Sequence, residues 1–179
     1  LGDVYKRQDL TIVGPENLLD EGVVDTFKKF GHKIFGPTKF ASKLESSKIY
    51  ARDIMKKYDI PHPKYFGCKN KEEVCYAKEK LGLPIVLKAD GLAAGKGVII
   101  CKKEEDFQKA LSSFYDSKSF GIAAEKISVE ECIVGPEISI FTVCNGSDYK
   151  IINNAQDHKR ILDNDKGPNT GGMLSLIHI

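Results

Sequence analysis

The sequence predicts a mixed α/β and α+β protein, built from two parts of different architecture. Two observations carry this prediction: short apolar runs alternate with helical stretches near the beginning, and a loop with three glycines lies between two later apolar runs. Strands and helices that alternate with tight links favour a parallel sheet, whereas two strands joined directly by a loop form an antiparallel hairpin. Prolines at positions 61 and 63 separate the two parts.

The first part reads as the end of a parallel α/β unit. A short strand is expected at 10–13, ending in the turn Gly14-Pro15, and a second at 33–35. Between them, apolar residues recur on one helical face from Leu18 to Phe30, and Gly31 closes the stripe, which predicts a single helix. Another helix is expected from Ser47 to the prolines, because apolar residues again recur at four-residue steps.

The second part predicts an antiparallel sheet with two helices. Asn70, followed three residues later by Glu73, is typical of a helix N-terminus, so a helix is expected over 71–81. A further helix carries Phe107, Leu111 and Phe114 on one face. Strands are expected at 65–68, 85–89, 98–101, 128–131, 138–144 and around 150–152. The closing stretch QDHKRILDNDKGPNTGGM is expected to be a long polar loop.

Composition excludes several classes of protein. The 179 residues are 41% hydrophobic and 29% charged with a net charge of +2, which argues against a large basic face for nucleic acid. The apolar runs are much shorter than the ~18 residues that span a membrane. The five cysteines lack zinc-binding spacing, and most are expected to be buried in a reducing compartment. We therefore expect a soluble cytoplasmic protein with neither a nucleic acid nor a membrane as partner.

The two ends of the sequence can be encoded by one DNA sequence and its reverse complement. The codons GAT GTG TAT AAG AGA CAG encode residues 3–8, and their reverse complement, CTG TCT CTT ATA CAC ATC, encodes residues 174–179. This DNA sequence resembles the transposon end used to prepare sequencing libraries. We therefore expect residues 1–8 and 174–179 to be non-native tag, and residues 9–173 to be an internal fragment of a longer protein.

The glycine loop KADGLAAGKGVII indicates a phosphate-binding flap rather than a P-loop. A P-loop needs four residues between its glycines, a Ser or Thr after the lysine, and a following helix. Here Gly91 and Gly95 enclose three residues, Gly97 follows Lys96, and a β-branched run comes next. Glycines permit close approach and positive φ angles, so the loop can close over a polyphosphate with Lys88 beneath it. Read alone, a loop of this composition is an ordinary hairpin turn as often as it is a phosphate-binding loop.

Five segments in order and spacing carry a family resemblance: FGPTKFASKLESSK, PIVLKADGLAAGKGVII, VEECIVGPEISIF, QDHKR and DKGPNTGGM. Together they resemble the phosphoribosylamine–glycine ligases (glycinamide ribonucleotide synthetases) of the ATP-grasp superfamily, and the resemblance covers residues 9–173. It implies an ATP-grasp fold fragment. Its expected parts are the end of an N-terminal α/β domain at 9–39, connecting core helices at 40–61, a complete small lid subdomain at 62–129 and a truncated central core at 130–173.

The resemblance implies an ATP-dependent ligase of de novo purine biosynthesis. Such an enzyme activates glycine as glycyl phosphate, and the amine of 5-phosphoribosylamine displaces the phosphate to give glycinamide ribonucleotide. The Mg²⁺ ligands are expected downstream of Met173, so we expect no metal site in this chain and no activity from the chain alone. Another ATP-grasp ligase or a non-catalytic ATP-binding module stays open as an alternative, and the sequence does not fix the oligomeric state.

The nucleotide-binding residues follow from the same resemblance. Lys48 and Lys88 are expected to bind phosphates, Lys96 to reach the γ-phosphate, residues 130–133 to form the adenine hinge, and Glu137 to accept from the ribose. From the residues alone, a helical lysine is usually solvated and paired acids usually lie on an edge strand. The expected set is Lys48, Lys88, Gly91, Gly95, Lys96, Gly97, Glu130, Glu131, Cys132, Ile133 and Glu137.

Two further groups are implied on the substrate side. One follows the first strand, where α/β sheets place ligands, and is expected near phosphoribosylamine. The other comprises the polar cluster after position 156, which alone would read as a surface turn, and a loop of backbone donors. The residues are Gly14, Pro15, Glu16, Asp157, His158, Lys159, Asn169, Thr170, Gly171 and Gly172. No catalytic residue is assigned.

Overall fold

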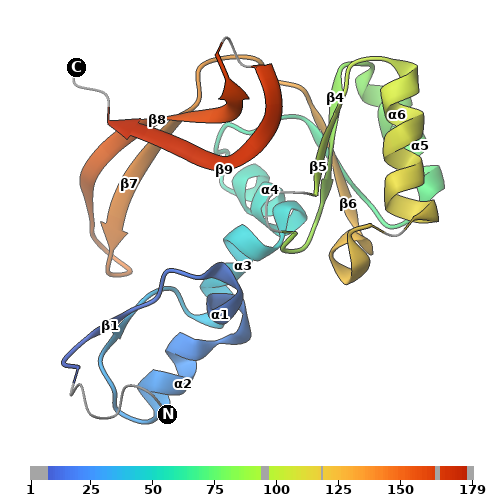
Figure 1. Ribbon diagram of the computed structural model, residues 1–179. Coiled ribbons are helices and arrows are strands. Elements are labelled where there is room, and N and C mark those ends of the chain that lie inside the picture. Colours follow the sequence, from blue (N-terminus) through green and yellow to red (C-terminus); the bar gives the residue numbers. More distant parts are fainter. Residues whose placement is uncertain (1–7, 94–96, 118, 164–165, 177–179) are drawn as a thin grey trace. The chain divides into compact units, whose positions relative to one another are not determined.

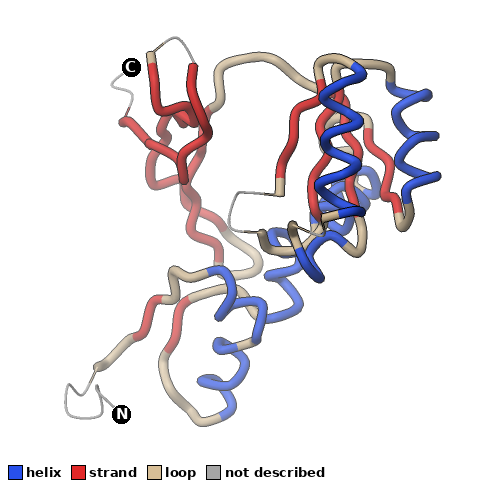
Figure 2. Tube along the Cα trace, turned by 45° about the vertical axis from the view of Figure 1, so that its right-hand side comes forward, coloured by secondary structure: helices blue, strands red, loops and turns tan. Residues whose placement is uncertain are grey.

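The computed structural model describes residues 8–93, 97–117, 119–163 and 166–176. It divides into two compact units, Leu1–Cys132 and Ile133–Ile179, and each is described by itself. Figure 1 labels their elements, and Figure 2 colours them by secondary structure. None of the helices in the described ranges is long and apolar enough to cross a membrane.

The first unit opens with a small parallel α/β arrangement. Strand β1 (Thr11–Ile12) pairs in parallel with β2 (Ile34–Phe35), as predicted. The helix expected between them is instead two helices, α1 (Glu16–Glu21) and α2 (Val23–Lys29). Gly22 separates them with φ 91°, a left-handed conformation that other residues rarely adopt, so the prediction of one continuous helix was wrong.

Two short helices lead from this arrangement to the next sheet. Helix α3 (Lys39–Ser46) begins at Thr38, whose side chain accepts from the Ala41 N–H. Helix α4 (Lys48–Lys57) begins at Ser47, which caps the Tyr50 N–H in the same way. The chain leaves α4 before Pro61, and the prediction of a helix from Ser47 is confirmed.

A four-stranded antiparallel sheet with two helices completes the first unit, and we call this part the lid. Its strands are β3 (Tyr65–Cys68), β6 (Ile127–Glu131), β4 (Ile85–Ala89) and β5 (Val98–Cys101), in the order β3-β6-β4-β5. Helices α5 (Lys71–Leu81) and α6 (Glu104–Leu111) cover one face (Figures 1 and 2). A π-helical turn (Ser112–Asp116) and a 3-10 turn (Gly121–Ala124) follow α6.

The lid has a continuous apolar core on the face that carries α5 and α6. Burial alternates along β4, so Ile85, Leu87 and Ala89 face this core while Val86 and Lys88 face the other way. The predicted Asn70 cap of α5 is present, with the Asn70 side chain accepting from the Glu73 N–H. The buried cluster consists of Cys68, Val74, Ala77, Ile85, Leu87, Ala89, Cys101, Phe107, Ala110, Leu111, Phe114, Ile127 and Val129.

The cysteines only partly follow the expectation of burial. Cys68 and Cys101 are buried in the lid core, and burial raises the pKa of Cys68 to about 12 and that of Cys101 to about 11. Both therefore stay as unreactive thiols at neutral pH. Cys75 and Cys132 are half-buried and Cys144 is exposed, so the expectation that most cysteines are buried was wrong.

The second unit is a three-stranded antiparallel sheet. Its strands β7 (Ile138–Cys144), β8 (Tyr149–Leu162) and β9 (Lys166–Leu176) pair in that order, with register shifts that interrupt both ladders. The prediction of β7 is confirmed, but the prediction of a long polar loop after position 155 was wrong. Glycine, asparagine and proline are poor strand formers, and here pairing with a distant partner strand overrides that local preference. The expected tag residues Leu174–Leu176 belong to β9.

Candidate functional site

The glycine loop joins two paired strands, as the flap interpretation predicts. Strand β4 ends at Ala89 and β5 begins at Val98, with Lys88 opposite Val98 in the ladder. The Ala89 N–H donates to the Gly97 carbonyl at 2.7 Å, which closes the hairpin at its base. No helix follows the loop, so a P-loop is excluded. Gly95 and Lys96 lie outside the described residues.

Gly91 and Gly97 are required for packing and not for a left-handed backbone. Neither has a positive φ, and the third glycine of the loop, Gly95, lies outside the described residues. A Cβ on Gly97 would lie 2.8 Å from the Cβ atoms of Ala89 and Ala93, and one on Gly91 would lie 2.9 Å from Ala123 Cα. These distances are too short for real contacts. Gly97 therefore lets the loop pack closely against its own base, and Gly91 lets it pack against the 3-10 turn Gly121–Ala124.

Lys88 is held by a buried carboxylate on the lid face opposite the core. Its Nζ lies 2.8 Å from Glu130 Oε2, and the Glu130 side chain is 1% exposed whereas that of Lys88 is 23% exposed. Arg52 on α4 reaches the same carboxylate, with Nη2 at 2.9 Å from Oε2 and Nε at 3.3 Å from Oε1. The Ser128 hydroxyl donates to Oε1 at 3.0 Å. One carboxylate thus joins two cations from β4 and α4.

The Glu130 carboxylate is ionised despite its burial. Burial raises the pKa of a carboxyl group, but the hydrogen bonds and charges of Arg52 and Lys88 outweigh that effect and hold the pKa of Glu130 below its usual range. A buried charge that is paired in this way fixes its partners in space, because breaking either contact leaves the carboxylate poorly solvated. The Lys88 side chain is therefore held at Glu130 while part of it stays accessible.

Lys48, on α4, approaches the first residues of the glycine loop, Asp90 and Gly91, which we call the root of the flap. It is the first residue of that helix, and its Nζ lies 3.4 Å from the Gly91 carbonyl. The structure therefore gathers four of the predicted nucleotide-binding residues around the same side of the lid, namely Lys48, Lys88, Gly91 and Glu130. Polyphosphates are bound by such combinations of ammonium groups and a glycine loop.

Two backbone N–H groups of the predicted adenine hinge already form hydrogen bonds within the lid. The Glu131 N–H donates to the Lys64 carbonyl at 2.9 Å, and the Cys132 N–H lies 3.4 Å from the Pro84 carbonyl. These donors are in use, so contacts with a base would have to come from other backbone groups. Ile133 and Glu137 belong to the second unit, in which the Glu137 carbonyl accepts from the Asp157 N–H at 3.0 Å.

The predicted substrate-side residues lie in two separate places in the chain. Gly14, Pro15 and Glu16 are exposed between β1 and the first turn of α1. Residues 157–159 lie on β8 and residues 169–172 on β9, where His158 pairs with Met173. The prediction that 169–172 form a loop was therefore wrong, because this backbone belongs to a sheet.

Sequence reasoning missed two groups of residues at the site. Arg52 could have been found, because it follows Lys48 by one helical turn and so shares its face. Ser128 and Asp90 carry no such local signal. Ser128 meets Lys88 only through the pairing of β6 with β4, and Asp90 meets α4 across 41 residues of sequence.

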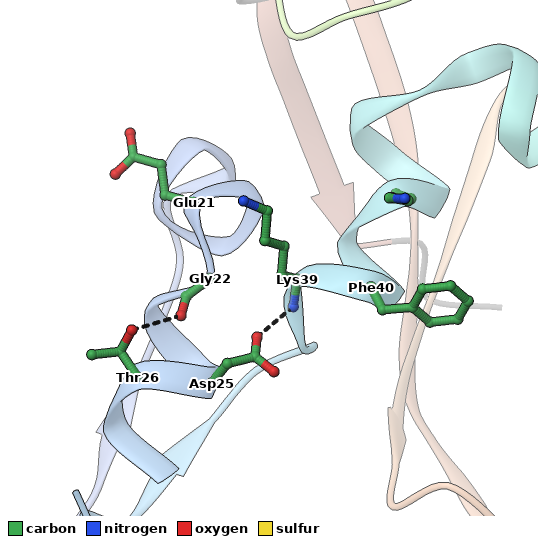
Figure 3. A pocket seen from close by; sticks show the side chains of 7 residues that line it. Glu21, Gly22, Asp25, Thr26, Lys39 and Phe40 are labelled. Atoms are coloured by element: carbon green, nitrogen blue, oxygen red, sulfur yellow. Dashed lines mark hydrogen bonds between the residues drawn. The ribbon is translucent and has the colours of Figure 1, made fainter. Parts of the chain in front are cut away.

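A separate hollow of about 550 Å³ lies among α1, α2 and α3 (Figure 3). Its wall mixes acidic and basic side chains, and the Asp25 carboxylate accepts from the Lys39 N–H at 2.7 Å. None of its residues belongs to the predicted site. In the described ranges, no group of three His, Cys, Asp or Glu residues is placed to hold a metal ion. The lining residues are Glu21, Gly22, Asp25, Thr26, Lys39, Phe40 and Lys43.

Family models match nearly the whole chain. The model of the phosphoribosylglycinamide synthetase N domain covers residues 4–45, and that of its ATP-grasp (A) domain covers residues 46–178. The chain belongs to the phosphoribosylglycinamide synthetase family. Its ATP-grasp portion therefore includes the glycine flap and the Lys88–Glu130 pair.

Individual relatives agree with this membership. The chain is 43% identical to the phosphoribosylamine–glycine ligase of Streptococcus suis, over 97% of this chain and 42% of that protein. It is 46% identical to the ligase of Escherichia coli strain K12, over 94% of this chain and 39% of that protein. The chain thus spans about 40% of the length of these curated relatives.

Solved structures extend the comparison to the fold. The phosphoribosylamine–glycine ligase of Thermotoga maritima matches with a TM-score of 0.74 at 36% identity, over 82% of this chain and 38% of that one. Biotin carboxylase from Campylobacter jejuni matches with a TM-score of 0.72 at 20% identity, over 88% of this chain and 36% of that one. The second likeness shows a shared fold alone.

Proposed function

We propose that this chain is the ATP-binding part of a ligase that joins glycine to 5-phosphoribosylamine in the cytoplasm. Membership of the family supports the reaction class, and the names of the relatives supply the two substrates. The observation that carries the proposal is Lys88, which Glu130 holds beside a glycine hairpin. A fixed ammonium group next to the backbone donors of a glycine loop is an arrangement suited to phosphoryl transfer from ATP.

In the proposed reaction, a glycine carboxylate oxygen attacks the γ-phosphorus of ATP and ADP leaves. The nitrogen of phosphoribosylamine then attacks the carbonyl carbon of glycyl phosphate, and inorganic phosphate leaves. Lys88 and Lys48 neutralise charge on the phosphates, while the flap excludes water from the acyl phosphate. The proton lost by the amine has no assigned acceptor.

The remaining contacts of the proposed site are those implied by the sequence. Backbone groups of residues 130–133 contact the adenine, and Glu137 accepts from the ribose hydroxyls. Gly14 to Glu16 and the residues on β8 and β9 contact the substrates. Magnesium would neutralise phosphate charge in such chemistry, but the described residues offer no ligand set for it, so we derive no step through it. We place its ligands in the part of the relatives that this chain does not span.

Nucleotide titration tests the ATP-binding part of the proposal. Lys88→Met keeps the aliphatic stem and removes the charge, so ATP affinity measured by calorimetry should fall about tenfold, or ~1.4 kcal/mol. Arg52 still pairs with Glu130 in this variant, so the buried carboxylate keeps one of its two cations. Lys103→Met is the matched control, because Lys103 is exposed and pairs only with the exposed Glu105 among the described residues. Equal affinities for Lys88→Met and the unchanged chain would remove Lys88 from the site.

A chimera tests the substrates. The matching segment of the Escherichia coli relative is replaced by residues 9–173 of this chain and supplied with ATP, glycine and 5-phosphoribosylamine. Glycinamide ribonucleotide and ADP should form in equal amounts, whereas the 179-residue chain alone should form neither. A folded chimera that binds ATP but makes product only from another acid or amine would contradict the proposed substrates.

A further inference from the structure

Asp90 joins the root of the glycine flap to the beginning of α4. It lies between the last residue of β4 and Gly91. Its Oδ1 accepts from the Ile49 N–H at 2.8 Å, and the Ser47 hydroxyl lies 3.1 Å from both carboxylate oxygens. Its own carbonyl lies 3.4 Å from the Lys48 nitrogen, so one residue contacts three consecutive residues of the helix N-terminus.

These contacts supply hydrogen-bond acceptors and a negative charge that the sequence of α4 lacks at its N-terminus. The first N–H groups of a helix have no acceptor within the helix, and its N-terminus favours a negative charge. The first turn of α4 contains no acidic residue, and Ser47 caps only the Tyr50 N–H. Asp90 provides acceptors for the Lys48 and Ile49 N–H groups and also the missing charge.

Asp90 also links the helix that carries Lys48 to the lid. The Asp90 N–H donates to the Lys126 carbonyl, and the Gly91 N–H donates to the Ala123 carbonyl, each at 3.0 Å. Gly91 has no space for a Cβ beside Ala123. The flap root is therefore tied to the lid, and the Asp90 contacts tie the helix that carries Lys48 to that root.

A carboxylate beside a phosphate site otherwise opposes anion binding. Both Asp90 oxygens are turned toward donors on α4, which satisfies the carboxylate and directs it toward the helix. The same engagement argues against a role as a metal ligand, since Asp90 belongs to no metal-binding group among the residues placed by the structure.

We infer that Asp90 is a positioning residue that holds the N-terminus of α4 against the flap root, so that Lys48 stands beside Gly91 to receive a polyphosphate. This inference rests on the proposed ATP binding. It assigns Asp90 an effect on phosphate affinity that acts through Lys48.

The test compares Asp90→Ala and Asp90→Asn with Asp106→Asn in the 179-residue chain. Asp106 is the matched control, because it also accepts from backbone N–H groups at a helix N-terminus but does so at α6. Calorimetry with ATP and with adenosine should show about a tenfold loss for ATP in Asp90→Ala and less than about a twofold change for adenosine. Asp90→Asn keeps an acceptor and should lose less, while Asp106→Asn should bind ATP as the unchanged chain does.

A double-mutant cycle with Lys48→Met tests the route of the effect. If Asp90 acts through Lys48, Asp90→Ala should weaken ATP binding by less than about twofold in the Lys48→Met background. Equal losses for ATP and adenosine, or fully additive losses in the cycle, would overturn the inference in favour of a general structural effect. Loss of Mg²⁺-dependent binding in Asp90→Ala, with Mg²⁺-free ATP binding unchanged, would overturn it in favour of a metal ligand.

Amide exchange separates this inference from the proposed function. The Ile49 N–H should exchange faster in Asp90→Ala than in the unchanged chain or in Asp106→Asn, whether or not nucleotide is present. If the unchanged chain fails to bind ATP, the proposed function fails, while the Ile49 exchange rate still reports whether Asp90 holds the N-terminus of α4. Unchanged Ile49 exchange in Asp90→Ala would contradict the positioning role of Asp90 itself.

Discussion

The lid and the second unit are both antiparallel sheets, but they differ in what covers them. The lid buries one face of β4 and β6 beneath α5 and α6. In the second unit, Ala155 alone is a buried apolar residue among the side chains that the structure describes. Many large apolar side chains on β7 and β8 are exposed instead. A sheet becomes stable when an apolar face is covered. The lid therefore carries its own source of stability, whereas the described side chains of β7 and β8 form no comparable buried face.

The largest expected effect tests this difference directly. Leu87 on β4 is 0% exposed, whereas Leu162 on β8 is 59% exposed. Leu87→Ala should reduce the free energy of unfolding of the lid by about 3 kcal/mol, because it leaves a cavity in a packed core. Leu162→Ala should change stability by less than ~0.5 kcal/mol. Urea unfolding, followed by the exchange of β4 amides, measures both, and similar losses would contradict the contrast.

The same difference explains how far the sequence predicted the fold. Strands 65–68, 85–89 and 98–101 and helix 71–81 have the predicted bounds, because short apolar runs and the Asn70 cap are local signals. The second unit was misread after position 155, because its polar and glycine-rich strands are specified by pairing with distant residues. The site divides similarly. The motif KADGLAAGKGVII predicted the glycine hairpin and suggested a role for Lys88, whereas the contacts of Asp90 and Ser128 required the tertiary structure.

A second expected effect concerns the polar face of the lid. Glu130→Gln keeps the shape of the side chain but leaves Lys88 and Arg52 without their buried anion. We expect a loss of about 3 kcal/mol in the free energy of unfolding, the usual cost of removing one partner of a buried ion pair. Glu105→Gln is the control, since the Lys103–Glu105 pair is exposed, and it should cost less than ~0.5 kcal/mol. A loss below 1 kcal/mol for Glu130→Gln would show that the pair is weakly coupled to folding.

A smaller effect should appear as pH dependence. Because the folded-state pKa of Glu130 is lowered, its contribution to stability is present above the unfolded-state pKa of about 4.3 and is lost as pH falls through the lower folded value. The free energy of unfolding of the lid should therefore decline below about pH 4, and the decline should be shallower in Glu130→Gln. Identical slopes in the two proteins, measured by urea unfolding between pH 3 and pH 6, would exclude Glu130 as a contributor.

The most direct measurement is amide hydrogen exchange of the unchanged chain with and without ATP. Binding at the flap should slow exchange at the hairpin residues Lys88 and Val98 and at the N-terminus of α4, because these amides flank the proposed phosphate position. Amides in α5 and α6, on the opposite face of the lid, should change little by comparison. Protection confined to α5 and α6, or no protection at saturating ATP, would contradict the assignment of the glycine hairpin as the nucleotide-binding element.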